Sequence, residues 1–410
     1  MNKFTEMAKL EPPSVETVKS IAKHLMMYLR WIEHLQSEGK AIHEIHFPEL
    51  EESRVTWTYY RYLKRLLRQT NQPISLGVAK ARMQAVVNFY KGLLAWNLIL
   101  KSTLENEPYN STLAGIPVIN SAGIQCIKTI EITNFTFRVP KRSHIGEIKD
   151  GGRLRPLTEE EQTLILNQLK QSGNQAFILM CLVALFTGAR IQTVCTIRVK
   201  DIYYLHSNTS AEGEVLLLVG KGTGVDSKNQ KRYRIHFPVA LVRMLRDYIE
   251  SEEHLERRAL SFYRESNENY VFLTSNGSPY YTSTSEISDR QRGMFSQRIS
   301  AKDRVSFPIQ KGNAVRNYII RLVRDIQVIH PDFILFRFHD LRATFGMNFI
   351  RDADALGIKD VRAELKARMG HSNFDTTQGY LDFDKSNAAA KAAIAFHHER
   401  INRTFPRLQS

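Results

Sequence analysis

The fold of this chain is decided by three short segments near its end: FHDLR at 338–342, GH at 370–371 and TTQGY at 376–380. A fourth segment, TGAR at 187–190, lies far upstream. Together they supply two arginines, two histidines and one tyrosine in a fixed order. Arginine grips phosphate oxygens with a planar fork and keeps its charge, so such a set could attack a phosphodiester without a metal ion.

The first arginine of the set follows a long apolar run at 176–186, which predicts a buried helix too short to span a bilayer. Gly188 permits a turn after that helix, so Arg190 is expected at the end of an element. Taken alone, Arg190 is explained more simply as an ordinary arginine near a helix C-terminus.

The remaining members lie close together in the sequence. His339 and Arg342 are three residues apart, which predicts one shared helix face. His371 follows a short helix predicted at 361–369, and Tyr380 comes nine residues later. A lone tyrosine is usually a core or surface residue, and its pKa of about 10 makes it a poor nucleophile unless a base or cations stand nearby. The ordered set, and no single member, therefore favours chemistry.

Composition points to a polyanionic partner. The 410 residues predict two or three domains, and the formal net charge is +15 with a pI of about 9.6. Such a surplus favours nucleic acid first and an anionic membrane surface second. The N-terminus lacks the apolar core of a signal peptide, and the three cysteines have no zinc-ligand spacing. We therefore expect a cytoplasmic, nucleoid-associated protein with no membrane partner, no metal site and no cofactor.

The chain is expected to be mainly α with a small antiparallel β-hairpin. Residues 1–112 read as a helical domain, 113–155 as a linker with some strand character, and 156–410 as a catalytic domain with a helical tail. Within the first domain, apolar spacing predicts one helix from Ser14, which is expected as its N-cap, and others at 52–69 and 78–100.

The second predicted helix carries a basic face. Arg61, Lys64, Arg65 and Arg68 stand three or four residues apart and so share one side. An isolated run of this kind is usually a solvated surface. In a chain this basic, we interpret it as a contact to the DNA backbone.

The larger domain begins with a capping box, Thr158 to Glu161. Strands are predicted at 214–220 and 233–237, and the polar loop 221–231 joins them into a hairpin. Residues 280–312 are weakly patterned and are interpreted as an insertion or long loop.

In their order and local spacing, the four segments resemble the motif boxes of the tyrosine recombinase (phage integrase) family. The segment GKG at 220–222, at a strand end between the first two boxes, is similar to the β-hairpin lysine of that family. The resemblance covers about residues 156–390, and a helical region of suitable size precedes it. It implies a two-domain DNA clamp: a helical core-binding domain and an α+β catalytic domain.

The resemblance also implies a reaction. Tyr380 would attack a scissile phosphate and form a 3′-phosphotyrosyl link, while Arg190 and Arg342 hold the non-bridging oxygens. Lys221 would protonate the leaving 5′-oxygen. Because the covalent link keeps the bond energy, rejoining would need neither ATP nor metal.

The two histidines and the partners follow from the same resemblance. His339 would take the tyrosine proton, and His371 would donate a hydrogen bond to the phosphate. The implied function is site-specific integration or excision of a mobile element, or resolution of a replicon. The implied partners are double-stranded DNA, three further copies in a homo-tetramer on synapsed sites, and an accessory directionality factor.

Three features depart from the family pattern or extend it. Thr193 stands where the family often has a glutamate, so another acid is expected to fill that role. The separation between Arg190 and His339 is long, and no separate arm-binding domain is expected before the first helix. The small-residue-rich tail at 388–410 is expected to dock on a neighbouring protomer.

Two other functions fit the same residues. A type IB topoisomerase would use the same tyrosine chemistry on one duplex, as a monomer. A catalytically idle DNA-binding regulator belongs to another class, and the intact set of candidate residues argues against it. Strand exchange between two duplexes and a trapped covalent adduct would separate these functions.

Overall fold

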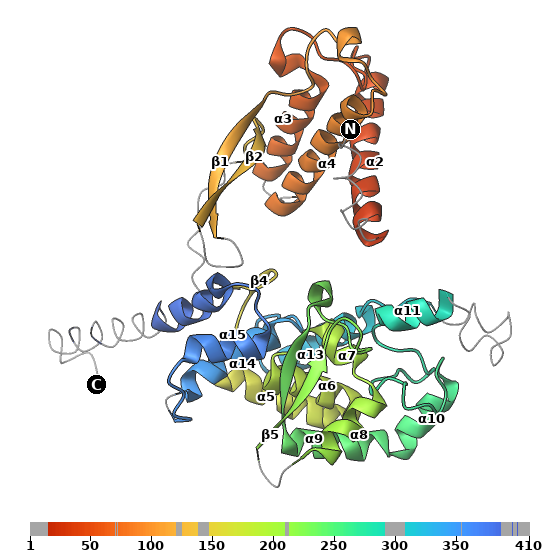
Figure 1. Cartoon of the computed structure of the whole chain (residues 1–410), viewed down its shortest axis with the longest axis vertical. Coiled ribbons are helices and arrows are strands. Elements are labelled where there is room, and N and C mark those ends of the chain that lie inside the picture. The colour runs from red at the N-terminus through yellow and green to blue at the C-terminus, as the bar shows by residue number, and fades with distance from the viewer. Residues whose placement is uncertain are drawn as a thin grey trace. The chain divides into compact units, whose positions relative to one another are not determined.

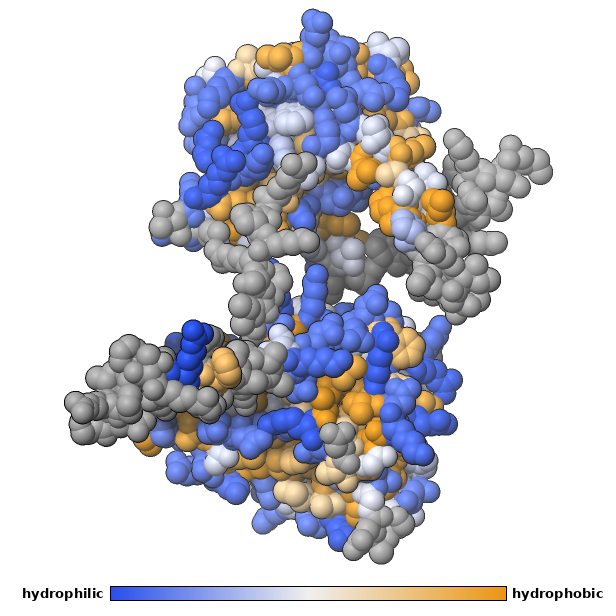
Figure 2. All heavy atoms as spheres, turned by 90° about the vertical axis from the view of Figure 1, so that its left-hand side faces the viewer, coloured by the Kyte–Doolittle hydropathy of each residue, from blue (hydrophilic) through white to orange (hydrophobic). Residues whose placement is uncertain are grey.

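The computed structural model describes residues 15–69, 71, 73–119, 125–137, 147–209, 213–291, 308–353, 355–386, 396 and 400. The chain divides into two compact units, Met1–Arg142 (unit 1) and Ser143–Ser410 (unit 2) (Figure 1). On the face shown in Figure 2, hydrophilic side chains (blue) cover much of each unit, with apolar areas (orange) between them. No helix in the described part of the chain is long and apolar enough to cross a membrane.

Unit 1 consists of helices followed by a β-hairpin. Its helical elements are α2 (Val15–Ser37), η1 (Glu51–Ser53), α3 (Val55–Arg68), α4 (Leu76–Ala95) and η2 (Lys101–Thr103). Strands β1 (Ser111–Ile119) and β2 (Gln125–Thr133) pair antiparallel, with Ser111 opposite Thr133. This hairpin begins two residues before the range 113–155 predicted as a linker with some strand character and otherwise lies within it.

Aromatic side chains fill the core of unit 1. Tyr28, Tyr59 and Tyr90 come from α2, α3 and α4, and all three are fully buried. The hydroxyls of Tyr28 and Tyr90 lie 2.9 Å apart, so these two buried groups are partners of each other, whereas the buried hydroxyl of Tyr59 has no hydrogen-bond partner among the described residues. The apolar spacing that predicted the first helix includes core residues such as Tyr28 and Ile32, whereas Val18 and Leu29 are exposed.

Two predicted helix ends in unit 1 differ from the structure or lie outside the described residues. The helix predicted at 78–100 ends earlier, because α4 stops at Ala95 and Asn97 adopts a left-handed conformation with φ 54°. The N-cap predicted at Ser14 lies outside the described residues.

Unit 2 is mainly helical with small antiparallel sheets, which confirms the predicted fold class. Its helices are α5 (Glu159–Ser172), α6 (Gln175–Thr187), α7 (Ile191–Thr196), α8 (Val199–Ser207), α9 (Val239–Ile249), α10 (Glu252–Leu260), α11 (Thr284–Gln291), α13 (Asn313–Ile329), α14 (Asp340–Asp352), α15 (Val361–Met369) and a helical segment at 374–386. Strands β3 (Ile148–Lys149) and β4 (Arg153–Leu154) form one hairpin, and β5 (Glu214–Val219) and β6 (Tyr233–Pro238) form another, with the 3-10 turn η3 (Lys228–Gln230) in its loop.

The apolar helix α6 is the centre of unit 2. It is apolar on all sides and contacts α14, α9 and β6. The predicted capping box is present, because Thr158 Oγ1 accepts from Glu161 N and the Glu161 carboxylate accepts from Thr158 N. The predicted short helix at 361–369 is α15. The weakly patterned range 280–312 contains α11, and its residues 292–307 lie outside the described residues.

A second core cluster of unit 2 holds the tyrosine of the final motif. Ile148 and Leu154, from β3 and β4, pack with Phe345 of α14 and with Tyr380, which has no exposed surface. Gly346 lets the two helical segments approach, since a Cβ atom there would lie 2.5 Å from Cε1 of Tyr380. Because Gly346 has no Cβ atom, the helical segment 374–386 can pack closely on α14.

Replacing Gly346 with alanine is expected to destabilise unit 2. The gain in helix propensity, about 1 kcal/mol, is smaller than the cost of overpacking a closed core, about 1–3 kcal/mol. Amide hydrogen exchange of α14 measures the effect on unit 2, because tryptophan fluorescence reports unit 1, which holds Trp31, Trp57 and Trp96.

Gly379→Ala is the matched control, because it lies in the helical segment 374–386 and a Cβ atom there meets no atom within 4 Å. It should leave exchange unchanged or slow it. Equal exchange in the two variants would show that the Gly346 contact does not limit packing.

Candidate active site

A glycine turn places Arg190 at the end of α6. Gly188 closes the helix with φ +66°, and Arg190 is the N-cap residue of α7. A Cβ atom at Gly188 would lie 2.5 Å from Cδ1 of Phe345, so the turn packs directly on α14. This contact brings Arg190 to the helix that carries Arg342.

Arg342 lies in the first turn of α14 and is almost completely buried. Its Nη1 donates to Gly188 O at 2.6 Å and its Nη2 donates to Met369 O at 2.8 Å. Its Nε donates to Asp150 Oδ2 at 2.6 Å. The guanidinium thus ties the turn after α6 to the end of α15.

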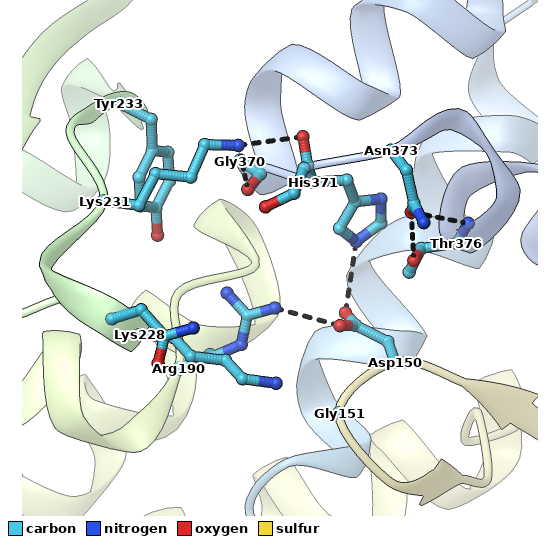
Figure 3. Close-up of a pocket in the computed structure, with 12 residues that line it drawn as sticks. Asp150, Gly151, Arg190, Lys228, Lys231, Tyr233, Gly370, His371, Asn373 and Thr376 are labelled. Carbon is cyan, nitrogen blue, oxygen red and sulfur yellow. Dashed lines mark hydrogen bonds and ion pairs between the residues drawn. The ribbon is translucent and has the colours of Figure 1, made fainter. Parts of the chain in front are cut away.

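A second glycine turn places His371. Gly370 ends α15 with φ +63°, and a Cβ atom there would lie 2.7 Å from the ring of Tyr233 on β6. Lys231 holds the turn as well, because its Nζ donates to Gly370 O at 3.0 Å and to His371 O at 2.9 Å. His371 points from this turn toward Asp150 (Figure 3).

Asp150 is the residue on which the set converges. Its Oδ1 accepts from Arg190 Nη2 at 2.9 Å. Its Oδ2 accepts from Arg342 Nε at 2.6 Å, from His371 Nε2 at 3.2 Å and from the Tyr380 hydroxyl at 3.3 Å. The structure therefore brings together Arg190, Arg342, His371 and Tyr380, and adds a buried carboxylate.

Asp150 was not predicted from the sequence. It precedes Gly151 and Gly152 in the turn between β3 and β4, inside the range 113–155 interpreted as a linker. The only available signal was a single acid before a glycine pair, in a chain that lacks the glutamate expected at Thr193. Thr193 itself is fully buried, and its hydroxyl has no hydrogen-bond partner among the described residues.

The charges in this cluster stabilise one another. Burial would raise the pKa of Asp150, but Arg342, His371 and Arg190 hold the pKa of that carboxyl well below its usual range. Burial lowers the pKa of Arg190, and the neighbouring Arg342 lowers it further. An ionised Asp150 can only accept, so the Nε2 atom of His371 carries the proton and its Nδ1 accepts from Thr377 Oγ1 at 2.8 Å.

The tyrosine and the other histidine are held neutral. Burial raises the pKa of the Tyr380 hydroxyl, and the charge of Asp150 raises it further. Burial lowers the pKa of His339 to about 4, assisted by Arg342 and Arg190. The Nε2 atom of His339 is buried and has no partner among the described residues.

A pocket of ≈ 280 Å³ opens beside this cluster (Figure 3). Cationic side chains dominate its charged lining: Arg190, Lys228 and Lys231, with the carboxylate of Asp150 among them. Burial lowers the pKa of Lys231, and Lys366 and Arg190 lower it further. Such a pocket suits an anion.

The candidate proton donor, Lys221, lies elsewhere on the same loop. It follows β5 and is exposed, and it does not line the pocket. Its backbone N donates to Gln230 O at 3.1 Å, which pairs the two ends of the loop. The loop therefore brings Lys228 and Lys231 to the pocket in this structure, whereas Lys221 is exposed to solvent outside the pocket.

The basic face predicted in unit 1 lies on α3. Arg61, Arg65 and Arg68 are exposed, and Lys64 is half-buried with its Nζ 5.1 Å from the ring centre of Tyr60. Arg61 pairs with Glu52 at 3.4 Å. Among the described residues, no group of three or more His, Cys, Asp or Glu side chains could hold a metal ion.

The lowered pKa of His339 predicts a pH dependence of stability. Below pH 6.5 the unfolded chain binds a proton at this residue that the folded chain does not bind until about pH 4. Stability should therefore fall as the pH drops from 6.5 toward 4, by roughly 2 kcal/mol at pH 5. Urea unfolding followed by circular dichroism should show this loss in the wild type and a smaller loss in His339→Asn.

His330→Asn is the control, since His330 is exposed. It should keep the wild-type loss. An unchanged loss in His339→Asn would mean that His339 is not held neutral by the fold.

No protein-family model and no curated protein sequence matches the chain. Solved structures do. The chain is similar to the integrase of transposon Tn1549 in complex with transposon right end DNA, at 15% identity and a TM-score of 0.50, over 95% of this chain and 97% of that one. Further matches are XerH site-specific recombinase bound to difH, at 15% identity and a TM-score of 0.41 over 80% and 68% of the two chains, and XerA recombinase, at 17% and 0.32 over 92% and 90%.

The likeness to the Tn1549 integrase extends over nearly the full length of both chains, and it shows the fold. The chain has the fold of the tyrosine recombinases.

Proposed function

We propose that this chain is a site-specific tyrosine recombinase that cleaves and rejoins DNA through a 3′-phosphotyrosyl intermediate. The observation that carries the proposal is the convergence of Arg190, Arg342, His371 and Tyr380 on one carboxylate. A carboxylate and a phosphate both present anionic oxygens to the same donors. Groups that surround Asp150 in the free chain can therefore surround a phosphate.

In the proposed reaction, one bond to phosphorus forms as another breaks. The Tyr380 oxygen forms a bond to phosphorus, and the bond from phosphorus to the 5′-oxygen breaks. The tyrosine proton goes to a base, and the leaving 5′-oxygen receives a proton. Arg190 and Arg342 would meet the charge that develops on the non-bridging oxygens, as His371 would through its Nε2–H.

His339 is proposed as the base. Its ring is neutral because its pKa is lowered to about 4, and its Nε2 atom has no partner among the described residues. A neutral imidazole with a free nitrogen can accept a proton. Its weak basicity is consistent with a site in which bound phosphate adds negative charge and strengthens the base.

The substrate is proposed to be double-stranded DNA. The similar Tn1549 integrase is bound to transposon DNA, and this chain carries a formal net charge of +15. The exposed basic residues of α3 are proposed to contact the phosphate backbone, which would make binding steeply salt-dependent. Assembly as a tetramer remains a proposal, and the tail expected to mediate it at 388–410 lies almost wholly outside the described residues.

Replacement of Tyr380 by phenylalanine tests the proposal. The change removes one hydroxyl and one hydrogen bond of 3.3 Å, so folding and DNA binding should survive. Covalent adduct should form with the wild type and vanish with Tyr380→Phe. The substrate is a nicked duplex that carries the sequence the protein selects from random DNA, and denaturing gels measure the adduct.

Tyr233 supplies the matched control, because its hydroxyl is also buried but has no role in the proposed reaction. Tyr233→Phe should still form adduct. Adduct with Tyr380→Phe would remove Tyr380 as the nucleophile. Strand exchange between two duplexes then separates a recombinase from a topoisomerase, which acts on one.

Lys221 is proposed as the proton donor, and Lys231 is proposed to be structural. Lys231 already donates to two backbone carbonyls, whereas Lys221 is exposed beside Gly222. A substrate with sulfur at the 5′-bridging position needs no proton to leave. Lys221→Ala should therefore cleave normal DNA slowly and the sulfur substrate at nearly the wild-type rate.

Lys231→Ala is the comparison, because it loosens the turn that holds His371 and should slow both substrates alike. Lys228→Ala, which removes a pocket cation, should weaken binding of both. An equal defect of Lys221→Ala on the two substrates would leave it only a binding role.

A further inference from the structure

The contacts of Asp150 occupy the donor atom that each of three partners directs at it. Arg342 Nε carries one hydrogen, which Asp150 accepts. His371 uses Nε2 on Asp150 and Nδ1 on Thr377. Tyr380 has one hydroxyl proton, which also points to Asp150.

The four other N–H hydrogens of Arg342 lie on Nη1 and Nη2, which contact other groups. Its Nη1 and Nη2 donate to the carbonyls of Gly188 and Met369, and the side chain is 1% exposed. A phosphate that needs Arg342, His371 and Tyr380 together must therefore take the donors that Asp150 holds now.

The residues that line the pocket support the same conclusion. The pocket is lined by Arg190, His371 and Asp150, whereas Arg342 and Tyr380 do not line it. An anion in the pocket would reach Arg190 but would be separated from the nucleophile. Asp150 is the residue that both lines the pocket and contacts Tyr380 and Arg342.

We propose that Asp150 is an internal competitor for the substrate phosphate: in the free chain its carboxylate occupies the position of the scissile phosphate, and it must withdraw before Tyr380 can react. This inference rests on the proposed function for the identity of the anion. The free chain is then held inactive, with its nucleophile buried and its arginines already paired.

The turn that carries Asp150 has features suited to withdrawal. It continues into Gly151 and Gly152, which have no side chains to anchor it, and Asp150 N donates to Gly152 O at 3.0 Å within the turn. Gly151 has φ +68°, a conformation that glycine adopts without strain. Ile148 and Leu154, on either side, are buried in the core.

A second role for Asp150 predicts the opposite result. If Asp150 replaced the glutamate missing at Thr193, it would support the arginines during the reaction, and its removal would abolish cleavage. As a competitor, it opposes the reaction, and its removal should favour the binding of an anion. The sign of the effect distinguishes the two roles.

Inorganic phosphate is the first probe, since it needs no knowledge of the DNA site. Calorimetric titration at pH 7.5 should show phosphate binding to Asp150→Asn at least about tenfold tighter than to the wild type, because the competitor is gone. The double variant Asp150→Asn, Arg190→Ala should lose that gain.

Asp226→Asn is the matched control for loss of a buried carboxylate. Asp226 is 4% exposed, and its described partners are neutral: Gln192, Gln230 and Thr284. It should bind phosphate as the wild type does. Equal binding of phosphate by Asp150→Asn and the wild type would overturn the proposal. Tight binding of phosphate by the wild type would also overturn it, and this measurement needs no variant.

Adduct formation on the nicked duplex is the second probe. Asp150→Asn should form adduct faster than the wild type. A fall to the level of Arg190→Ala would overturn competition and make Asp150 a positioning residue. If neither wild type nor variant forms adduct, the proposed function fails, while the phosphate titration still decides whether Asp150 occupies an anion site.

Discussion

The buried charge of Arg342 is the constraint on which unit 2 depends. A guanidinium with 1% exposure would be strongly unfavourable without partners, so the fold must supply acceptors for it. It does so from three distant segments, through Gly188 O, Met369 O and Asp150. Burial would lower the pKa of Arg342, but Asp150, together with Tyr380 and Tyr233, raises it.

Glycines make this arrangement sterically feasible. Gly188 and Gly370 end their helices in the left-handed conformation, and each lies against an aromatic ring that a Cβ atom would strike. Gly346 allows Tyr380 to pack on α14. The motif glycines thus serve backbone geometry and close packing, and the charged residues beside them are positioned as a consequence.

Much of the site could be predicted because its members lie in short segments whose spacing is local. The end of α6, the start of α14 and the end of α15 follow from a turn glycine, helix spacing and a short apolar pattern. Asp150 could not be found in this way, since its partners lie 40, 192, 221 and 230 residues away. A polar turn before two glycines looks like a linker until tertiary packing buries it.

The position of the loop lysines was equally inaccessible to sequence, because loop conformation depends on contacts such as that of Lys231 with the 370–371 turn. The fold class, the long helices of unit 1 and helices α5, α6, α14 and α15 of unit 2 were predicted from apolar periodicity and capping, whereas α7 to α11 and α13 were not predicted. The extent of the β1–β2 hairpin was not predicted, as its strands carry exposed apolar side chains such as Leu113 and Ile127.

We propose that the groups around Asp150 form the phosphate site of a DNA-cleaving enzyme. A structure of the protein bound to its selected duplex, with Tyr380 changed to phenylalanine to prevent cleavage, tests this most directly. We expect one DNA phosphate within hydrogen-bond distance of Arg190, Arg342 and His371, with Asp150 displaced from all three. A phosphate bound elsewhere, with the contacts of Asp150 intact, would contradict it.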